Sequence, residues 1–291
     1  MSTILETKDL SKHYKDFKLK NINLQLSSGK ILGFIGQNGS GKTTTLKAIL
    51  GIIKYKGSIS LFGVDDDKEN RKKREEAKED IGVVLDNSFF SNSLIPIDIN
   101  NIMKDCYKNW DKDLYFKYLK DFDLPKLKSI RKFSTGMKKK LEIATALSHH
   151  PRLLILDEPT SGLDPIARQE ILQVFQDFVY DGECSILLST HITTDVEAIA
   201  DDILLINNGE TLLSMPYKEI MNKYGIVGLT QEEFDRINHH DFIKCIKMKN
   251  SCEVLVDKNT FTKKYGKYKM DDTNLEKLMT LMVKGEEKWK D

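Results

Sequence analysis

The segment "GQNGSGKTT" (36–44) constrains this chain more than any other, because it matches the phosphate-loop pattern G-x-x-x-x-G-K-[ST]. An apolar stretch (31–35) precedes it and a helical pattern (42–53) follows it, which is the context that the pattern requires. Glycines permit a tight turn that directs backbone N–H groups at one phosphate cluster, and the helix N-terminus adds its positive end. We therefore expect these residues to bind phosphate: Gly36, Gln37, Asn38, Gly39, Ser40, Gly41, Lys42, Thr43 and Thr44.

Two carboxylates end a buried-strand pattern in "LLILDEP" (153–159). Carboxylates at the end of an apolar strand need a reason, since burying an unpaired charge is costly. Lys42 can reach the β- and γ-phosphates, and we expect the Thr43 hydroxyl and Asp157 to hold Mg²⁺. Glu158 faces the other way and is placed to polarise the water that attacks the γ-phosphate. The alternative is a pair of exposed carboxylates in a turn.

A histidine ends another apolar stretch, "LLSTH" (187–191). A lone histidine at a strand end is usually incidental. Beside a phosphate loop and a carboxylate pair, His191 stands where a contact to the γ-phosphate is needed, so we predict a catalytic role for it.

Short apolar stretches alternate with helical ones along most of the chain. Strands are expected at 4–10, 19–26, 30–36, 57–63, 81–85, 153–159, 185–191 and 203–210, and helices across 94–147. Strands alternating with helices predict an α/β fold with a parallel sheet. The charge run 65–80 predicts a solvated loop and helix face. From 218 a polar tail follows, with alternating segments (242–248, 252–257) and a closing helical stripe of Leu275, Leu278, Met279 and Met282.

Composition excludes several classes of protein. The formal net charge of +1 provides no global field that would attract nucleic acid. Four scattered cysteines without a signal peptide predict free thiols in a reducing compartment. The longest apolar runs are far shorter than a membrane span, so a membrane function would need another polypeptide. The adjacent histidines at 149–150 and 239–240 lack the spacing for a shared metal ion.

The order of these motifs resembles the ATP-binding subunit of bacterial ABC transporters over residues 3–215. The resemblance implies a P-loop NTPase fold with a mainly parallel core sheet, an N-terminal antiparallel β subdomain and a helical signature subdomain (about 88–150). We expect an ATP-binding domain at 1–217 and a small α+β extension at 218–291 whose role is open. The resemblance further implies ATPase activity with ATP and Mg²⁺, a second ATPase subunit and a separate membrane permease. Such a chain works at the cytoplasmic face of the membrane.

"FSTGM" (133–137) occupies the signature position of this family, usually L-S-G-G-Q, which faces the phosphate loop of the other subunit. A helix start with hydroxyls and free N–H groups suits that task. By resemblance, Ser134, Thr135 and Gly136 contact ATP across the dimer, although Thr135 replaces a glycine and Met137 a glutamine. Resemblance also places Asp164 at the dimer interface and Tyr14 against adenine. Locally, we predict a capped helix with a buried stripe (Met137, Leu141, Ala144, Leu147) and with Lys138, Lys139 and Lys140 facing solvent.

One departure concerns the end of "IGVVLD" (81–86), where the family usually has glutamine and this chain has Asp86. A carboxylate binds Mg²⁺ more strongly but repels phosphate. We expect Asp86 on the metal side, with altered coupling and retained activity. The following segment (87–99) would face the membrane partner, and its Phe89, Phe90, Leu94 and Ile95 are either core residues or a docking groove.

The tail, including "LEKLMTLMVKGEE" (275–287), resembles bacterial exporter ATPases that act with a separate membrane subunit. We expect a Gram-positive peptide exporter, with phenol-soluble modulins or lantibiotics as candidate cargo and the tail packed on the partner subunit. Whether the pair is a homodimer or a related heterodimer is left open. One alternative is a soluble ATPase that acts on DNA or ribosomes. Such proteins have a central coiled coil, a second ATPase half or a basic patch, and this sequence shows none of these. Another, a regulatory module without turnover, conflicts with the presence of Glu158 and His191.

Overall fold

The computed structural model describes residues 2–67, 69–86, 90–271 and 273–286. A six-stranded sheet with the order β10-β9-β3-β8-β7-β6 forms its centre. Its strands are β3 (Ile31–Ile35), β6 (Ile81–Val84), β7 (Leu153–Asp157), β8 (Ser185–Thr190), β9 (Asp202–Asn207) and β10 (Glu210–Pro216). Only the β9–β10 pair is antiparallel, and β3, β7 and β8 are buried along their whole length. The predicted mainly parallel α/β core is therefore confirmed.

A second sheet, with the order β2-β1-β4-β5, is antiparallel as expected. It consists of β1 (Thr3–His13), β2 (Lys18–Ser27), β4 (Lys56–Leu61) and β5 (Val64–Asp65). Helix α1 (Lys42–Ile49) buries Leu46 and Ile49 in one core with residues of both sheets. It ends four residues before the end of the predicted pattern, close to Gly51, whose φ is +71°.

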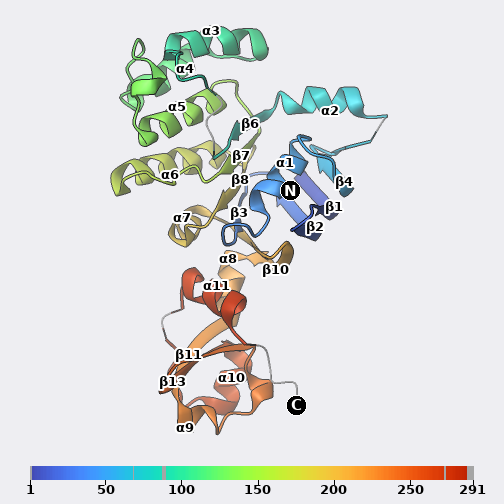
Figure 1. Cartoon of the computed structure of the whole chain (residues 1–291), viewed down its shortest axis with the longest axis vertical. Coiled ribbons are helices and arrows are strands. Elements are labelled where there is room, and N and C mark those ends of the chain that lie inside the picture. Colours follow the sequence, from blue (N-terminus) through green and yellow to red (C-terminus); the bar gives the residue numbers. More distant parts are fainter. Residues whose placement is uncertain (1, 68, 87–89, 272, 287–291) are drawn as a thin grey trace.

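Helices cluster at one end of the molecule (Figure 1), where α3 (Pro96–Cys106), α4 (Lys112–Asp121) and α5 (Thr135–Leu147) lie together. A short 3₁₀ turn (Ile130–Lys132) leads into α5, and α6 (Pro165–Val179) and α7 (Thr193–Ile199) follow. The charge run forms α2 (Arg71–Lys78). It is solvated as predicted except for Arg74, which is 4% exposed and donates to the carbonyls of Ile49 and Val64.

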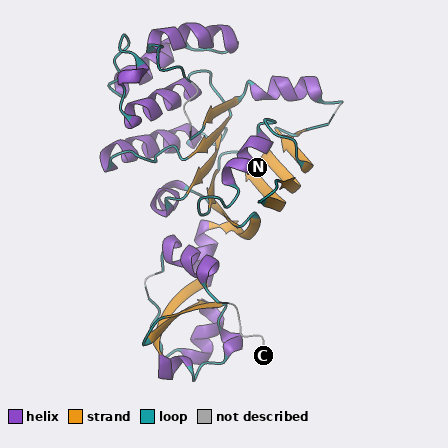
Figure 2. Cartoon of the chain, viewed as in Figure 1, coloured by secondary structure: helices purple, strands orange, loops and turns teal. Residues whose placement is uncertain are grey.

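The C-terminal part lies at the opposite end from α3–α5 and mixes strands with helices (Figures 1 and 2). Its elements are α8 (Tyr217–Lys223), β11 (Tyr224–Thr230), α9 (Gln231–Phe234), a 3₁₀ turn (His239–Asp241), β12 (Lys244–Lys247), β13 (Ser251–Asp257), α10 (Lys258–Tyr265) and α11 (Leu275–Lys284). The sequence predicted β12, β13 and α11 but missed β11. In α11 the buried stripe is Leu275, Leu278 and Leu281, and Met279 and Met282 are only partly buried. This stripe packs against α7 of the same chain. Packing of the tail on a partner subunit stays a prediction.

Candidate active site

The phosphate-binding loop leaves the end of β3 and joins α1. Gly39 and Gly41 have φ angles of +81° and +116°, which disfavour any residue with a side chain. A Cβ atom at Gly36 would lie 2.4 Å from the carbonyl oxygen of Ile206, and one at Gly41 2.8 Å from Leu19 Cδ1. The Ser40 hydroxyl is buried and has no hydrogen-bond partner among the described residues. The glycines thus keep the loop close to the strands behind it.

Lys42 begins α1 and points its amine back over the loop. Its side chain is 6% exposed, and Nζ donates to the Gly36 carbonyl at 2.7 Å. Burial lowers the pKa of Lys42, and the nearby carboxylates of Glu158 and Asp157 oppose that shift. Because Nζ also lies 3.8 Å from Glu158 Oε1, the amine stands between the loop and the predicted catalytic carboxylate. This is the position from which a cation can reach a bound phosphate.

Two of the predicted metal-side residues, Thr43 and Asp157, meet at the end of β7. Asp157 is 1% exposed, and its Oδ2 accepts a hydrogen bond from the Thr43 hydroxyl at 2.7 Å. Its Oδ1 accepts one from the Ser189 hydroxyl at 2.7 Å, a partner that the sequence did not single out. The alternative of two exposed carboxylates in a turn is therefore wrong. The described residues contain no group of three or more His, Cys, Asp or Glu suited to a metal. A hydroxyl, a carboxylate and phosphate oxygens nevertheless form a donor set that fits Mg²⁺.

Glu158 and His191 come from different strand ends and form a hydrogen-bonded pair. Glu158 Oε2 lies 2.8 Å from His191 Nδ1 and accepts from the Thr190 hydroxyl at 3.2 Å. The φ angle of Glu158 is +51°, an unfavourable value for a residue with a side chain. Such strain is typical of functional sites. The structure thus brings the two predicted catalytic residues together.

The phosphate loop, Asp157 and Glu158 open into one pocket of about 450 Å³. His191 is not among the residues that line it. Tyr14, which is 45% exposed, lines this pocket, and its contact with adenine stays a prediction. Phe17 lines the pocket too and was missed, although a second aromatic residue three positions after Tyr14 was the available signal. Asp86 also lines the pocket and is exposed. The lining residues are Tyr14, Phe17, Gln37, Asn38, Gly39, Gly41, Lys42, Thr43, Thr44, Asp86, Asp157 and Glu158.

The signature residues do not line this pocket. Ser134 caps α5, accepting the Met137 N–H at 3.1 Å, and Ser134 and Thr135 are exposed. Asp164 likewise caps α6, where the N–H groups of the first helical turn hold the pKa of its carboxyl below the usual value. Thr135 Cγ2 lies 3.4 Å from the Cβ position of Gly162, so the signature and the loop before α6 are neighbours. Together they form a second polar surface.

The three lysines of α5 do not all face solvent. Lys139 is 6% exposed, and its Nζ donates to the carbonyls of Leu85 and Asp86 at 3.2 and 3.4 Å. The prediction was wrong for this residue because α5 packs against β6, which puts Lys139 over the end of that strand. Lys138 and Lys140 are partly exposed and reach Asn92 and Glu170.

The segment after Asp86 borders the signature helix. Phe89 lies outside the described residues, whereas Phe90 and Leu94 are partly buried against the main core. Ile95 caps α3 and is also partly buried. Because these side chains are only partly buried, the segment could belong to the core or form a docking groove, and both predictions stand.

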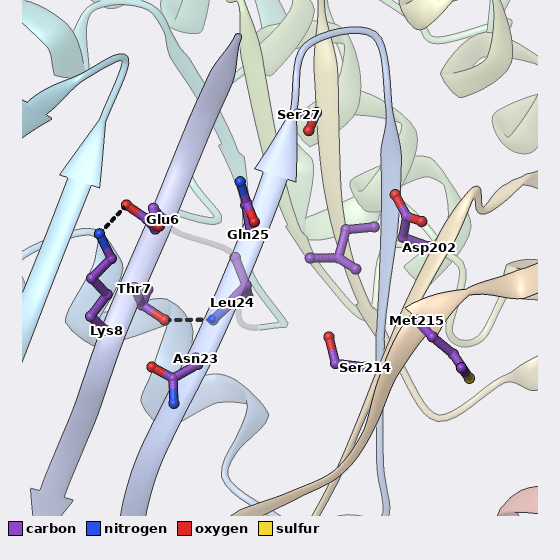
Figure 3. A pocket seen from close by; sticks show the side chains of 11 residues that line it. Glu6, Thr7, Lys8, Asn23, Leu24, Gln25, Ser27, Asp202, Ser214 and Met215 are labelled. Atoms are coloured by element: carbon purple, nitrogen blue, oxygen red, sulfur yellow. Dashed lines mark hydrogen bonds and ion pairs between the residues drawn. The ribbon is translucent and has the colours of Figure 1, made fainter. Parts of the chain in front are cut away.

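A second pocket, of about 540 Å³, lies between β1 and β2 on one side and β9 and β10 on the other (Figure 3). Some of its polar groups are already paired. Lys8 Nζ pairs with Glu6 at 2.9 Å, and Thr7 Oγ1 bonds the backbone of Ile22 and Leu24. None of the predicted phosphate, metal or catalytic residues lines it. The chemistry therefore belongs to the pocket at the phosphate loop.

The fold and this site define a P-loop ATPase of the ATP-binding cassette class. The model of the ABC transporter family matches residues 19–161. The bacitracin transport ATP-binding protein BcrA of Bacillus licheniformis is 36% identical over 77% of this chain and 73% of its own length. The lantibiotic transport ATP-binding protein SrtF of Streptococcus pyogenes is 33% identical over 74% of this chain and 91% of its own.

Solved structures agree with this assignment. A structure titled as the ATP-binding subunit of an ABC transporter is 28% identical, with a TM-score of 0.67 over 75% of this chain and 92% of that one. The chain thus belongs to the ABC transporter family, as an ATP-hydrolysing, ATP-binding subunit. No helix in the part of the chain that the structure describes is long and apolar enough to cross a membrane.

Proposed function

We propose that this protein drives peptide export by closing two ATPase subunits over two ATP molecules. One observation carries the proposal: most of the phosphate loop lines one pocket together with Asp157 and Glu158, whereas the signature residues lie outside that pocket, with Ser134 and Thr135 exposed. An exposed helix start with two hydroxyls is suited to bind an anion supplied by another molecule. A second subunit with the same arrangement would complete each site.

The residues divide the hydrolysis between them. ATP lies with its phosphates in the loop 36–44 and its adenine against Tyr14, with Phe17 beside it. Lys42 exchanges its bond to the Gly36 carbonyl for the phosphates. Thr43 and Asp157, with Asp86 beside them, would hold Mg²⁺, which neutralises phosphate charge when bound.

Glu158 accepts a proton from the attacking water, and its bond to His191 fixes its direction. His191 contacts the γ-phosphate once the site closes. Ser134, Thr135 and Gly136 of the second subunit, with Asp164 at the interface, bind the phosphates from the other side.

The names of the relatives support a proposal for the cargo and the partners. Two relatives are named for the transport of bacitracin and of a lantibiotic. We infer that this chain serves the export of similar amphipathic peptides, through a separate permease at the cytoplasmic face of the membrane. Phenol-soluble modulins stay a further candidate. No observation favours the nucleic-acid or non-hydrolysing alternatives.

Glu158→Gln tests this function. The amide keeps the shape of the side chain but cannot accept the proton, so ATPase activity should fall by about 10²- to 10³-fold. ATP binding should persist and should trap a closed dimer, detected by light scattering. The exposed Glu232→Gln serves as the matched control and should leave turnover unchanged. Normal turnover by Glu158→Gln would refute the role of Glu158 as the base.

A further inference from the structure

Lys139 connects two functional surfaces of this chain. It lies on α5, five residues after Ser134, and its amine binds the carbonyls of Leu85 and Asp86 at 3.2 and 3.4 Å. Asp86 lines the ATP pocket of the same chain. The helix that presents the signature is therefore held by a side chain to the strand end that presents Asp86.

The position of this lysine is unusual for a side chain of its type. A buried ammonium group is unfavourable unless its donors are satisfied, and Lys139 is only 6% exposed. An apolar residue would fill the same space without that penalty. The acceptors that offset it are the two carbonyls, with Glu142 Oε2 3.9 Å away. The amine therefore has a defined task, which is to hold the backbone at 85–86 against α5.

Backbone hydrogen bonds extend the same connection. The N–H groups of Ile130 and Arg131, just before α5, donate to the carbonyls of Leu94 and Asn92 at 2.9 and 3.0 Å. The Lys138 amine reaches the side chain of Asn92 at 3.3 Å. Within the described residues, however, Lys139 is the member of α5 whose side chain reaches Asp86 itself. A shift of Asp86 would be passed to α5 most directly through this amine.

We propose that Lys139 is a positioning residue that couples the two ATP sites of the dimer. This inference rests on the proposed sandwich, in which Asp86 serves the ATP of its own chain and α5 serves the ATP of the partner. Binding of ATP beside Asp86 sets the position of the 85–86 carbonyls, and Lys139 transmits that position to the signature helix. Coupling of this kind is reciprocal, so each ATP favours the binding of the other.

Lys139→Met tests the coupling, because it keeps the aliphatic stem and removes the donors. In the full-length Glu158→Gln background, we expect the ATP concentration for half-maximal dimerisation to rise about tenfold. Binding of a ribose-labelled fluorescent ATP analogue to the single chain should stay within about twofold, since Lys139 does not line the pocket. In the chain with Glu158 intact, the Hill coefficient of ATP hydrolysis should fall towards 1.

Two matched variants separate coupling from stability. Lys139→Arg retains donors for both carbonyls and should restore dimerisation to within about threefold of the parent. Lys138→Met removes the neighbouring amine, whose bond is to an exposed side chain, and should leave the midpoint unchanged. A purely structural role would weaken single-chain nucleotide binding as well and would lower the thermal midpoint in proportion.

The outcomes are distinct. If Glu158→Gln dimerises with ATP and the added Lys139→Met leaves the midpoint unchanged, the coupling role is refuted while the sandwich stands. If Glu158→Gln stays monomeric at saturating ATP, the sandwich fails and the coupling fails with it. A tenfold shift with intact single-chain binding supports both.

Discussion

In the proposed dimer each ATP site has two halves, the phosphate loop of one chain and the signature of the other, and these halves differ in how complete they are on one chain. At the phosphate loop, Lys42 and Asp157 are buried and hydrogen-bonded, and Glu158 is bonded to His191. At the signature, Ser134 and Thr135 are exposed, and the capping bond of Ser134 is made within its own helix. The first half is pre-organised for catalysis, whereas the second offers hydroxyls and N–H groups to a ligand held elsewhere. This difference is what a site shared by two subunits requires.

Removing the Lys42 amine from the phosphate-loop half should cause the largest loss of ATPase activity. We expect Lys42→Ala to lower ATPase activity by about 10³-fold, because no other described amine reaches over the loop. Binding of the fluorescent ATP analogue to the single chain should be lost as well. Lys47→Ala, on the exposed face of the same helix, is the control and should behave as the parent does. Retained nucleotide binding by Lys42→Ala would show that the loop backbone suffices.

Blocking the signature half should reduce ATP hydrolysis without changing nucleotide binding to the single chain. In Ser134→Arg, a bulky side chain occupies the surface offered to the partner, so ATPase activity should fall by about 10²-fold. Single-chain nucleotide binding should not change, and loss of the helix cap should lower the free energy of unfolding by about 1 kcal/mol. Ser134→Thr keeps a capping hydroxyl and should retain most of the activity. Weakened single-chain binding in Ser134→Arg would place the signature in the chain's own pocket.

Asp86 lies between the two halves, and its replacement should have a smaller effect. Asp86→Gln removes a charge near the phosphates but keeps an oxygen ligand, so turnover should stay within about threefold of the parent. The Mg²⁺ concentration for half-maximal ATPase activity should rise, because an amide binds the ion less strongly than a carboxylate. Complete loss of activity would show that the carboxylate is essential.

Replacing the buried His149, which lies outside both halves, should alter the stability of the fold and not ATP binding or hydrolysis. His149 is 2% exposed, stacks on Tyr107 with ring centroids 4.0 Å apart, and has a pKa lowered by burial from 6.5. As the pH falls, His149 therefore takes up a proton at a higher pH in the unfolded chain than in the folded protein. The stability that neutral His149 provides is present above pH 6.5 and is lost as the pH falls through its folded pKa.

The measurement is urea unfolding between pH 7.5 and about 5. His149→Phe keeps the stacking and should reduce the slope of unfolding free energy with pH by up to about 1.4 kcal/mol per unit. The exposed His240→Gln should leave the slope unchanged. An unaltered slope in His149→Phe would assign the pH dependence to other groups.

Most of the core could be predicted because its signals are local. The phosphate loop, the carboxylate strand end and the helix cap at Ser134 each depend on a few adjacent residues. The burial of the core strands could likewise be predicted from their apolar runs alone.

What could not be predicted depends on contacts between distant segments. Lys139 looks like an outward lysine until α5 is packed on β6, and Arg74 looks solvated until its helix meets the ends of α1 and β5. Similarly, the Thr160 hydroxyl donates to buried Asp195 at 2.5 Å, joining the loop after β7 to α7. Burial raises the pKa of Asp195, and no spacing in the sequence indicated this bond.

The most direct test of the shared site is to mix two inactive chains, Lys42→Ala and Ser134→Arg. In the mixed dimer, one site has both defects and the other pairs an intact phosphate loop with an intact signature. We expect mixing to restore roughly a quarter of the parent ATPase activity, since half of the dimers are mixed and each mixed dimer has one intact site. Activity no greater than the sum of the two separate variants would contradict a site shared between subunits.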